Sequence, residues 1–151
     1  MSRRWTRGDL AARIDHTLLD PAATEHDILM ACEIARRNHC ATVCLNSNRV
    51  AVANDVLKGS DVGIAAVVGF PFGASHMDAK AREAALAISD GATEIDMVVD
   101  IGRLKDGQFG PVRDLPRVAC GIYLIVRVAR ASRLSVKVGS ITTVDPLTRE
   151  D

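Results

Sequence analysis

The sequence predicts an α/β protein in which parallel β-strands alternate with α-helices. Strand-like and helix-like runs follow one another with short loops between them, which is typical of a parallel sheet. The strand positions 15, 44, 67 and 96 are 29, 23 and 29 residues apart, close to the size of successive strand–helix units. Such a series closes into a (β/α)8 barrel of the TIM type or spreads into an open doubly wound sheet. Polar residues inside the strands, Asp15, Thr17 and Asp96, favour the barrel, because its catalytic groups gather at the C-terminal ends of the strands.

The first part of the chain contains a strand, a helix and a second strand. Residues 10–19 are interpreted as the end of a short helix or as the first strand. Thr24 is a candidate N-cap for a helix that ends near Asn38. The apolar residues between Thr24 and Asn38 have helical spacing. Residues 39–45 form a buried strand.

The middle of the chain repeats this pattern. A short helix over residues 49–58 is closed by Gly59, and residues 62–68 form an almost wholly apolar strand. The loop 69–73 has glycines that permit a close approach of the backbone to a ligand. Ser75 opens a capping box for a helix that runs to about Asp90, and Gly91 ends it.

The stretch around Asp96 carries the strongest chemical signal. Because side chains alternate along a strand, Ile95 and Met97 share one face while Glu94 and Asp96 share the other. An ionised carboxylate in a covered strand costs several kcal/mol unless it is paired or hydrogen-bonded. Asp96 is therefore either a structural group that takes a cation or a backbone N–H, or a catalytic acid/base.

Composition excludes several classes of function. The 151 residues fit one domain, and the 19 basic and 19 acidic residues give a net charge of zero, so nothing indicates binding of nucleic acid or an anionic membrane. No run approaches the length of a membrane span, and a cytoplasmic location is expected.

The cysteines and histidines predict neither disulfides nor a metal site. The cysteines have no C-x-x-C spacing, which favours buried, reduced thiols over zinc, and no histidine pair has metal-ligand spacing. No cofactor is expected. The residues concerned are Cys32, Cys40, Cys44, Cys120, His16, His26, His39 and His76.

The last part of the chain differs from the rest. Residues 116–144 contain five basic residues and no acidic residue, and residues 123–128 fit a helix or a strand equally well. Residues 136–138 are predicted to form a fifth strand.

Four motifs, in order along residues 10–115, resemble deoxyribose-phosphate aldolase. They are IDHTLL (14–19), TVCLN (42–46), VGFPFG (68–73) and GATEIDMV (91–98). The resemblance implies a (β/α)8 barrel and a class I aldolase, which needs no metal. Such an enzyme reversibly joins acetaldehyde to glyceraldehyde 3-phosphate as 2-deoxyribose 5-phosphate, so the partner implied is a small phosphorylated sugar or aldehyde.

The resemblance also assigns site residues. In the family a lysine forms a Schiff base with the aldehyde, a second lysine depresses its pKa, and an aspartate helps to shuttle protons. Asp96 matches that aspartate. Asp15 and Thr17 match a polar pair on the first strand, and Cys44 matches a cysteine that lines the site.

The sequence departs from the family at the nucleophile. The Lys-Thr-Ser-Thr-Gly context of the Schiff-base lysine on the sixth strand does not occur in the 151 residues. Lys137 follows Asp96 by 41 residues, one strand–helix unit, so it is interpreted as the lysine of the family's fifth strand, near the site. Ser47 stands where the family usually has Pro, and Asp100 where it has Asn.

The other lysines are expected to be solvated. Lys58 and Lys80 fall on predicted helices and Lys105 in a turn, whereas a Schiff-base lysine must be buried or lie near another cation.

The sequence thus predicts a single, truncated aldolase-type barrel domain over residues 1–151, with about the first five strands and a divergent segment over residues 116–151. Such a barrel would have unpaired strand edges and an open apolar interior, so the chain is expected to pair with a second copy, to rearrange into an open sheet, or to be a piece of a longer protein. In the last case, truncation or an altered reading frame is the expected cause. Two function classes follow: an aldolase polypeptide that acts only if the other strands are supplied, or a catalytically silent half-barrel that oligomerises or binds a phosphorylated ligand. A nucleotide-binding open sheet ranks below them, because residues 69–73 contain no G-x-G-x-x-G.

Overall fold

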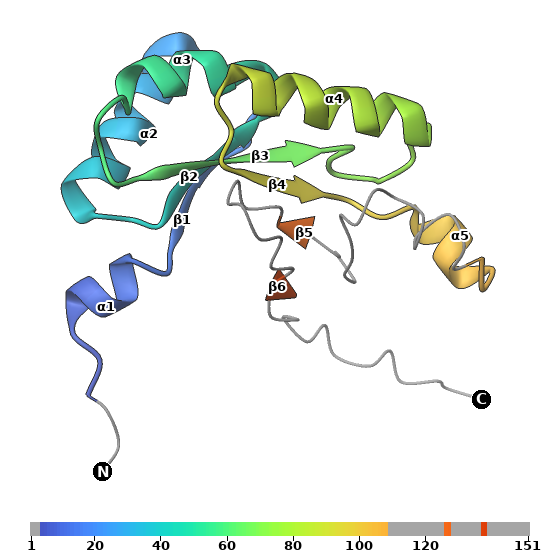
Figure 1. Ribbon diagram of the computed structural model, residues 1–151, viewed down its shortest axis with the longest axis horizontal. Helices are drawn as coiled ribbons and strands as arrows, with labels where there is room; N and C mark the ends of the chain where they lie inside the picture. The colour runs from blue at the N-terminus through green and yellow to red at the C-terminus, as the bar shows by residue number, and fades with distance from the viewer. Residues whose placement is uncertain (1–3, 109–125, 128–136, 139–151) are drawn as a thin grey trace.

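The computed structural model describes residues 4–108, 126–127 and 137–138. Residues 4–108 contain four parallel strands and a layer of helices. The strands are β1 (Asp15–Leu18), β2 (Thr42–Asn46), β3 (Gly63–Val68) and β4 (Glu94–Met97), in that order across the sheet. The helices are α1 (Arg7–Ala11), α2 (Glu25–Asn38), the 3-10 turn η1 (Ser47–Arg49), α3 (Val50–Val56), α4 (Met77–Asp90) and α5 (Ile101–Lys105). Helices α2, α3 and α4 cover one face of the sheet (Figure 1).

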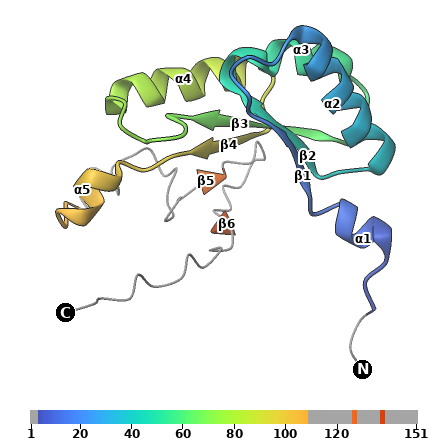
Figure 2. The ribbon, with the colours of Figure 1, turned by 180° about the vertical axis from the view of Figure 1, so that it is seen from behind.

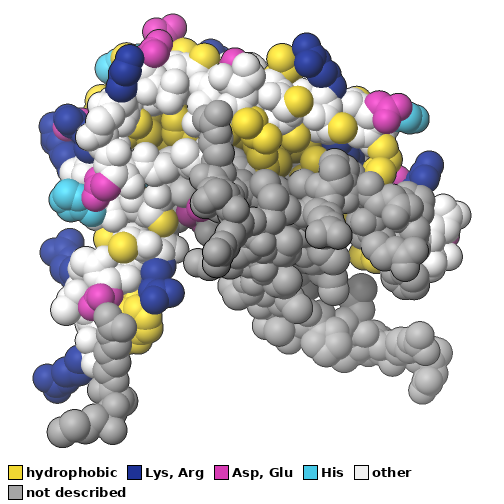
Figure 3. Space-filling model, in the orientation of Figure 1, with side chains coloured by type: hydrophobic (Ala, Val, Ile, Leu, Met, Phe, Trp, Pro, Cys, Tyr) yellow, Lys and Arg dark blue, Asp and Glu magenta, His cyan; other side chains and the backbone are white. Residues whose placement is uncertain are grey.

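The two faces of the sheet have different chemistry. The helix-facing side is the apolar core, formed by Val43, Leu45, Ile64, Ala66, Val68, Ile95 and Met97. We call the opposite side the inner face; it carries Asp15, Thr17, Thr42, Cys44, Ala65, Val67 and Asp96. Charged side chains stand on the outer surface of the helices, and hydrophobic side chains gather below them along the sheet (Figure 3). The predicted alternation along the fourth strand is confirmed.

Helix α2 begins as predicted. Thr24 accepts a hydrogen bond from the backbone N–H of Asp27, and the Asp27 carboxylate accepts one from the backbone N–H of Thr24 at 2.8 Å. This reciprocal capping box satisfies two N–H groups that the first turn leaves without helical partners. The helix ends at Asn38, and His39 follows in the left-handed conformation.

Helix α4 begins one residue later than the predicted capping box requires. His76 is the N-cap, and its Nδ1 accepts a hydrogen bond from the backbone N–H of Asp78 at 3.3 Å. The prediction that Ser75 caps this helix is wrong, because the helix begins at Met77, which makes His76 the N-cap and leaves Ser75 one residue before it. Gly91 ends the helix with φ of 116°, as predicted.

The chain after β4 differs in detail from the prediction. A short helix, α5, starts at Ile101 before the predicted turn at Gly107. The predicted strand at residues 136–138 is present as β6 (Lys137–Val138), but it pairs antiparallel with β5 (Val126–Arg127) and does not extend the parallel sheet. Figure 2 shows β5 close to β4, although β5 and β6 form a two-stranded sheet of their own. The other residues of the 116–151 segment lie outside the described ranges.

Within the described residues, no helix has both the length and the apolar character needed to cross a bilayer.

Candidate active site

Asp96 lies in β4 on the inner face, with only 5% of its surface exposed. The register of the sheet places it beside Val67 of β3. Because both strands run in the same direction, their C-terminal ends lie at the same end of the sheet. In (β/α)8 enzymes the active site lies at this C-terminal end of the strands. The carboxylate is thus held by a buried strand near this end of the sheet.

Cys44 is the side chain that the structure brings to Asp96. Its Sγ lies 4.0 Å from Oδ2 of Asp96 and donates a buried hydrogen bond to that oxygen. The two residues come from β2 and β4, and the strand between them places Ala65 beside Cys44. On the inner face of β3, Ala65 lies beside Cys44 and Val67 lies beside Asp96. Of the predicted site residues, this pair is brought together directly.

Asp15 and Thr17 lie on the same face, at the edge strand β1. Thr42 donates a hydrogen bond of 2.7 Å to Oδ1 of Asp15, and the Thr17 hydroxyl donates to the backbone carbonyl of Asp15 at 2.9 Å. Thr17 is the register partner of Cys44. Sequence reasoning did not single out Thr42, although its position two residues before Cys44 places it on the inner face.

Lys137 lies in β6, outside the four-stranded sheet. The backbone of Lys137 pairs with Arg127 of β5 and not with any of the strands β1–β4. Lys137 is therefore not among the residues that the four-stranded sheet brings to Asp96.

Lys80 is the main correction to the sequence analysis. The expected solvated side chain is 1% exposed, and its ammonium donates hydrogen bonds to the backbone carbonyls of Gly73 and, at 2.9 Å, Val98. Burial lowers the pKa of Lys80, and the Asp100 carboxylate acts in the opposite direction. The missed signal is the helical spacing of residues 77, 80, 84 and 87, which puts Lys80 on the inward stripe of α4.

Glu83, one helical turn after Lys80, binds the loops that follow β2 and β3. Its carboxylate accepts hydrogen bonds from the backbone N–H of Gly69 at 3.0 Å and from the hydroxyl of Ser47 at 2.7 Å. Ser47 directly follows β2, and Gly69 directly follows β3. The ends of two strands are therefore tied to α4 through one side chain.

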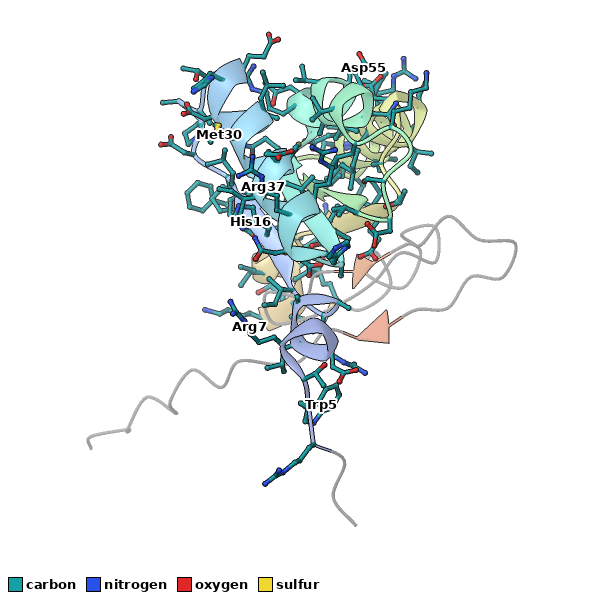
Figure 4. The ribbon with its side chains drawn as sticks, turned by 90° about the vertical axis from the view of Figure 1, so that its left-hand side faces the viewer. Trp5, Arg7, His16, Met30, Arg37 and Asp55 are labelled. Carbon is teal, nitrogen blue, oxygen red and sulfur yellow. The ribbon has the colours of Figure 1, made fainter. Side chains whose placement is uncertain are left out.

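Two hollows occur on the β1 side of the molecule, away from Asp96. One, of about 510 Å³, lies between β1 and α2 and is lined by residues that include His16, Thr17 and Met30. The other, of about 340 Å³, reaches α1 and includes Leu10 and Ile14. Figure 4 looks at this side of the molecule and labels His16 and Met30. Neither hollow is lined by Asp96 or Cys44.

Among residues 4–108 and the short strands, no three His, Cys, Asp or Glu side chains are grouped as metal ligands. Cys32, Cys40 and Cys44 are buried thiols.

We compared the chain with known proteins. No family model matches the chain. A deoxyribose-phosphate aldolase of Aciduliprofundum boonei is 47% identical over 116 residues, which are 76% of this chain and 52% of that protein. The chain belongs to the deoxyribose-phosphate aldolase family. It spans about half the length of the curated aldolase, and this partial coverage agrees with a resemblance to the N-terminal part of the family.

Solved structures of the family share the fold. A candidate deoxyribose-phosphate aldolase from Coccidioides immitis superposes with a TM-score of 0.70 and 33% identity, over 76% of this chain and 47% of that one. The tetrameric deoxyribose phosphate aldolase from Aeropyrum pernix superposes with a TM-score of 0.65 and 30% identity, over 71% and 46%. The described strands β1–β4 are therefore the first four strands of an aldolase-type barrel.

Proposed function

We propose that the chain supplies the first strands of a working deoxyribose-phosphate aldolase. The reaction is the reversible cleavage of 2-deoxy-D-ribose 5-phosphate to D-glyceraldehyde 3-phosphate and acetaldehyde through a lysine Schiff base. The observation that supports this most is the buried Cys44–Asp96 pair on the inner face of a parallel sheet, in a chain of this family. The Schiff-base lysine is supplied by strands beyond those described here.

Asp96 is the proposed proton carrier. A Schiff-base aldolase must remove the proton of the sugar hydroxyl when the carbon–carbon bond breaks and then protonate the resulting enamine. A carboxylate on a rigid, buried strand can perform both transfers, because its position does not depend on a mobile loop. Cys44 holds Oδ2 of Asp96 in place through its hydrogen bond.

Asp15, Thr17 and Lys137 are proposed to surround the site. Asp15 and Thr17 supply polar groups from β1, where Thr42 fixes the Asp15 carboxylate. Lys137 supplies a positive charge near the phosphorylated substrate, as expected for the fifth-strand lysine of the family.

A catalytically silent half-barrel is the alternative. It is favoured by the position of Lys137, which the strand pairing leaves outside the parallel sheet. In this case the chain persists as an oligomer or binds a small phosphorylated ligand.

We also propose that the chain self-associates. The Aeropyrum pernix aldolase is a tetramer, and β1 is an edge of the described sheet with exposed apolar side chains beside it. Covering this strip with a second copy removes it from water. The strip consists of Leu10, Ile14, Met30 and Ile34.

Borohydride trapping separates the two functions. The chain is mixed with the part of the Aciduliprofundum boonei aldolase that it does not match, and acetaldehyde and borohydride are added. The aldolase proposal predicts sugar-phosphate cleavage and a stable adduct on a lysine of the added part, and neither activity nor adduct with the chain alone. An adduct on Lys137 of the chain alone would make Lys137 the nucleophile.

The silent half-barrel predicts no adduct in any mixture although circular dichroism shows both polypeptides folded. This outcome would contradict the proposed aldolase function.

A further inference from the structure

The turn that follows β3 approaches the exit of β4 unusually closely. Gly73 has φ of 66°, and a Cβ atom there would lie 1.8 Å from the carbonyl oxygen of Val99. Gly69 has φ of 63°, and a Cβ atom there would lie 2.8 Å from Cε of Lys80. Only glycine fits at either position, so the backbone of the turn is packed directly on β4 and on the Lys80 side chain.

The Lys80 ammonium joins the two segments. It donates to the carbonyl of Gly73, in the turn, and to the carbonyl of Val98, just after β4. Both carbonyls are backbone groups whose burial without a donor would be costly, and a charged donor makes the stronger kind of hydrogen bond. Asp100, two residues after Val98, provides the opposite charge and also caps α5 through the backbone N–H of Arg103.

We propose that Lys80 is a positioning residue, a buried ammonium clamp that fixes the Gly69–Gly73 turn to the end of β4 and so holds the rim of the inner face beside Asp96. Asp100 is its counter-charge. Glu83 completes the clamp by holding the N–H of Gly69 at the other end of the turn. The clamp is a property of the fold; its effect on catalysis rests on the proposed aldolase function.

Ser47 extends the clamp to the end of β2. Its hydroxyl donates to Glu83 of α4, and the same carboxylate holds the N–H of Gly69 after β3. Lys80 of the same helix holds the carbonyl of Val98 after β4. Two side chains of α4 thus link the ends of β2, β3 and β4.

Amide hydrogen exchange tests the clamp without reference to activity. Lys80→Met keeps the length of the side chain and removes the charge, whereas Lys80→Arg keeps a cationic donor. We expect exchange at Gly69 and Gly73 to be about tenfold faster or more in Lys80→Met, the size of a lost charged hydrogen bond, and to be restored at least in part by Lys80→Arg. Lys58→Met, at an exposed lysine, is the matched control and should leave these amides unchanged.

Equal protection in Lys80→Met and wild type would overturn the proposal, because the side chain would then act by filling space alone. If Lys80→Met does not fold, Asp100→Asn replaces it. The Cε chemical shift of Lys80 should then titrate at lower pH than in wild type, and an unchanged titration would contradict the role of Asp100.

The catalytic consequence is measured in the complemented assembly, which is the mixture of this chain with the part of the Aciduliprofundum boonei aldolase that it does not match. Lys80→Met should lower kcat about tenfold with little change in KM, because the clamp positions Asp96 and does not bind substrate. An inactive wild-type assembly would contradict the aldolase function, whereas the exchange experiment would still decide the clamp. Unchanged kcat with faster exchange would show that the clamp holds the turn but does not position Asp96.

Discussion

Single side chains on the inner face make polar contacts in a sheet that is otherwise apolar. Asp96 and Cys44 come from strands that are not neighbours in the sheet, yet their side chains make contact. Sequence reasoning could select Asp96, because a carboxylate in a strand-like run is conspicuous, whereas Cys44 was selected through the resemblance to the aldolase family. It could not predict their direct contact, because this depends on the register of three strands.

Thr42→Val tests the polar pair on β1. The substitution removes the hydroxyl that donates to the Asp15 carboxylate at 2.7 Å and keeps the shape of a buried side chain. We expect it to lower the free energy of unfolding by about 1 kcal/mol, measured by urea denaturation. Thr17→Val, at an exposed hydroxyl that water can replace, is the control and should cost less. An equal cost for the two variants would contradict the assigned role of Thr42.

Cys32 should resist alkylation in the folded protein. Burial raises the pKa of its thiol to about 11 from 9.0, so at pH 8 the reactive thiolate is about 100-fold scarcer than in the unfolded chain. Iodoacetamide labelling followed by peptide mass spectrometry should show Cys32 modified rapidly only in urea. Because the folded pKa is the higher one, this thiol contributes stability below about pH 9 that is lost as the pH rises toward 11. Equal labelling rates with and without urea would contradict the buried position.

At the scale of elements, local signals predicted most helices and strands. The sequence predicts the helix start at Thr24, the helix end at Gly91 and the apolar strand over residues 63–68, because each depends on residues that are close in sequence. Lys80 could not be placed by its residue type, since lysines on helices are usually solvated. Its acceptors are backbone carbonyls of two loops, which only the folded chain brings to α4.

Helix caps provide a matched pair of substitutions. Thr24→Ala removes a side chain that closes a capping box and should cost about 1 kcal/mol of unfolding free energy. Ser75→Ala should change stability by less than about 0.5 kcal/mol, because His76 and not Ser75 caps α4. Thermal or urea denaturation compares the two. A large cost for Ser75→Ala would restore the capping box that the sequence predicted.

At the scale of the whole molecule, the parallel order β1–β4 followed from the alternation of strands and helices. The pairing of β5 with β6 did not, because residues 123–128 fit a helix and a strand equally well and gave no register. The contribution of Lys137 to the site therefore stays a prediction.

Self-association is tested by light scattering of the intact chain. Ile34→Lys places a charge in the exposed strip beside β1 and should shift the mass toward the monomer. Ile88→Lys changes a similarly exposed side chain on α4 and should leave the mass unchanged. A monomeric wild type, or equal effects of the two variants, would contradict an interface at the β1 edge.

The most direct test of the account is the turnover of Asp96→Asn in the complemented assembly. Asparagine keeps the size of the side chain but cannot carry a proton, so kcat for cleavage of 2-deoxyribose 5-phosphate should fall by about 100-fold to 10,000-fold. Asp55→Asn, at an exposed carboxylate on α3, should leave kcat unchanged. Full activity of Asp96→Asn would contradict the claim that the inner-face carboxylate moves the protons of the reaction.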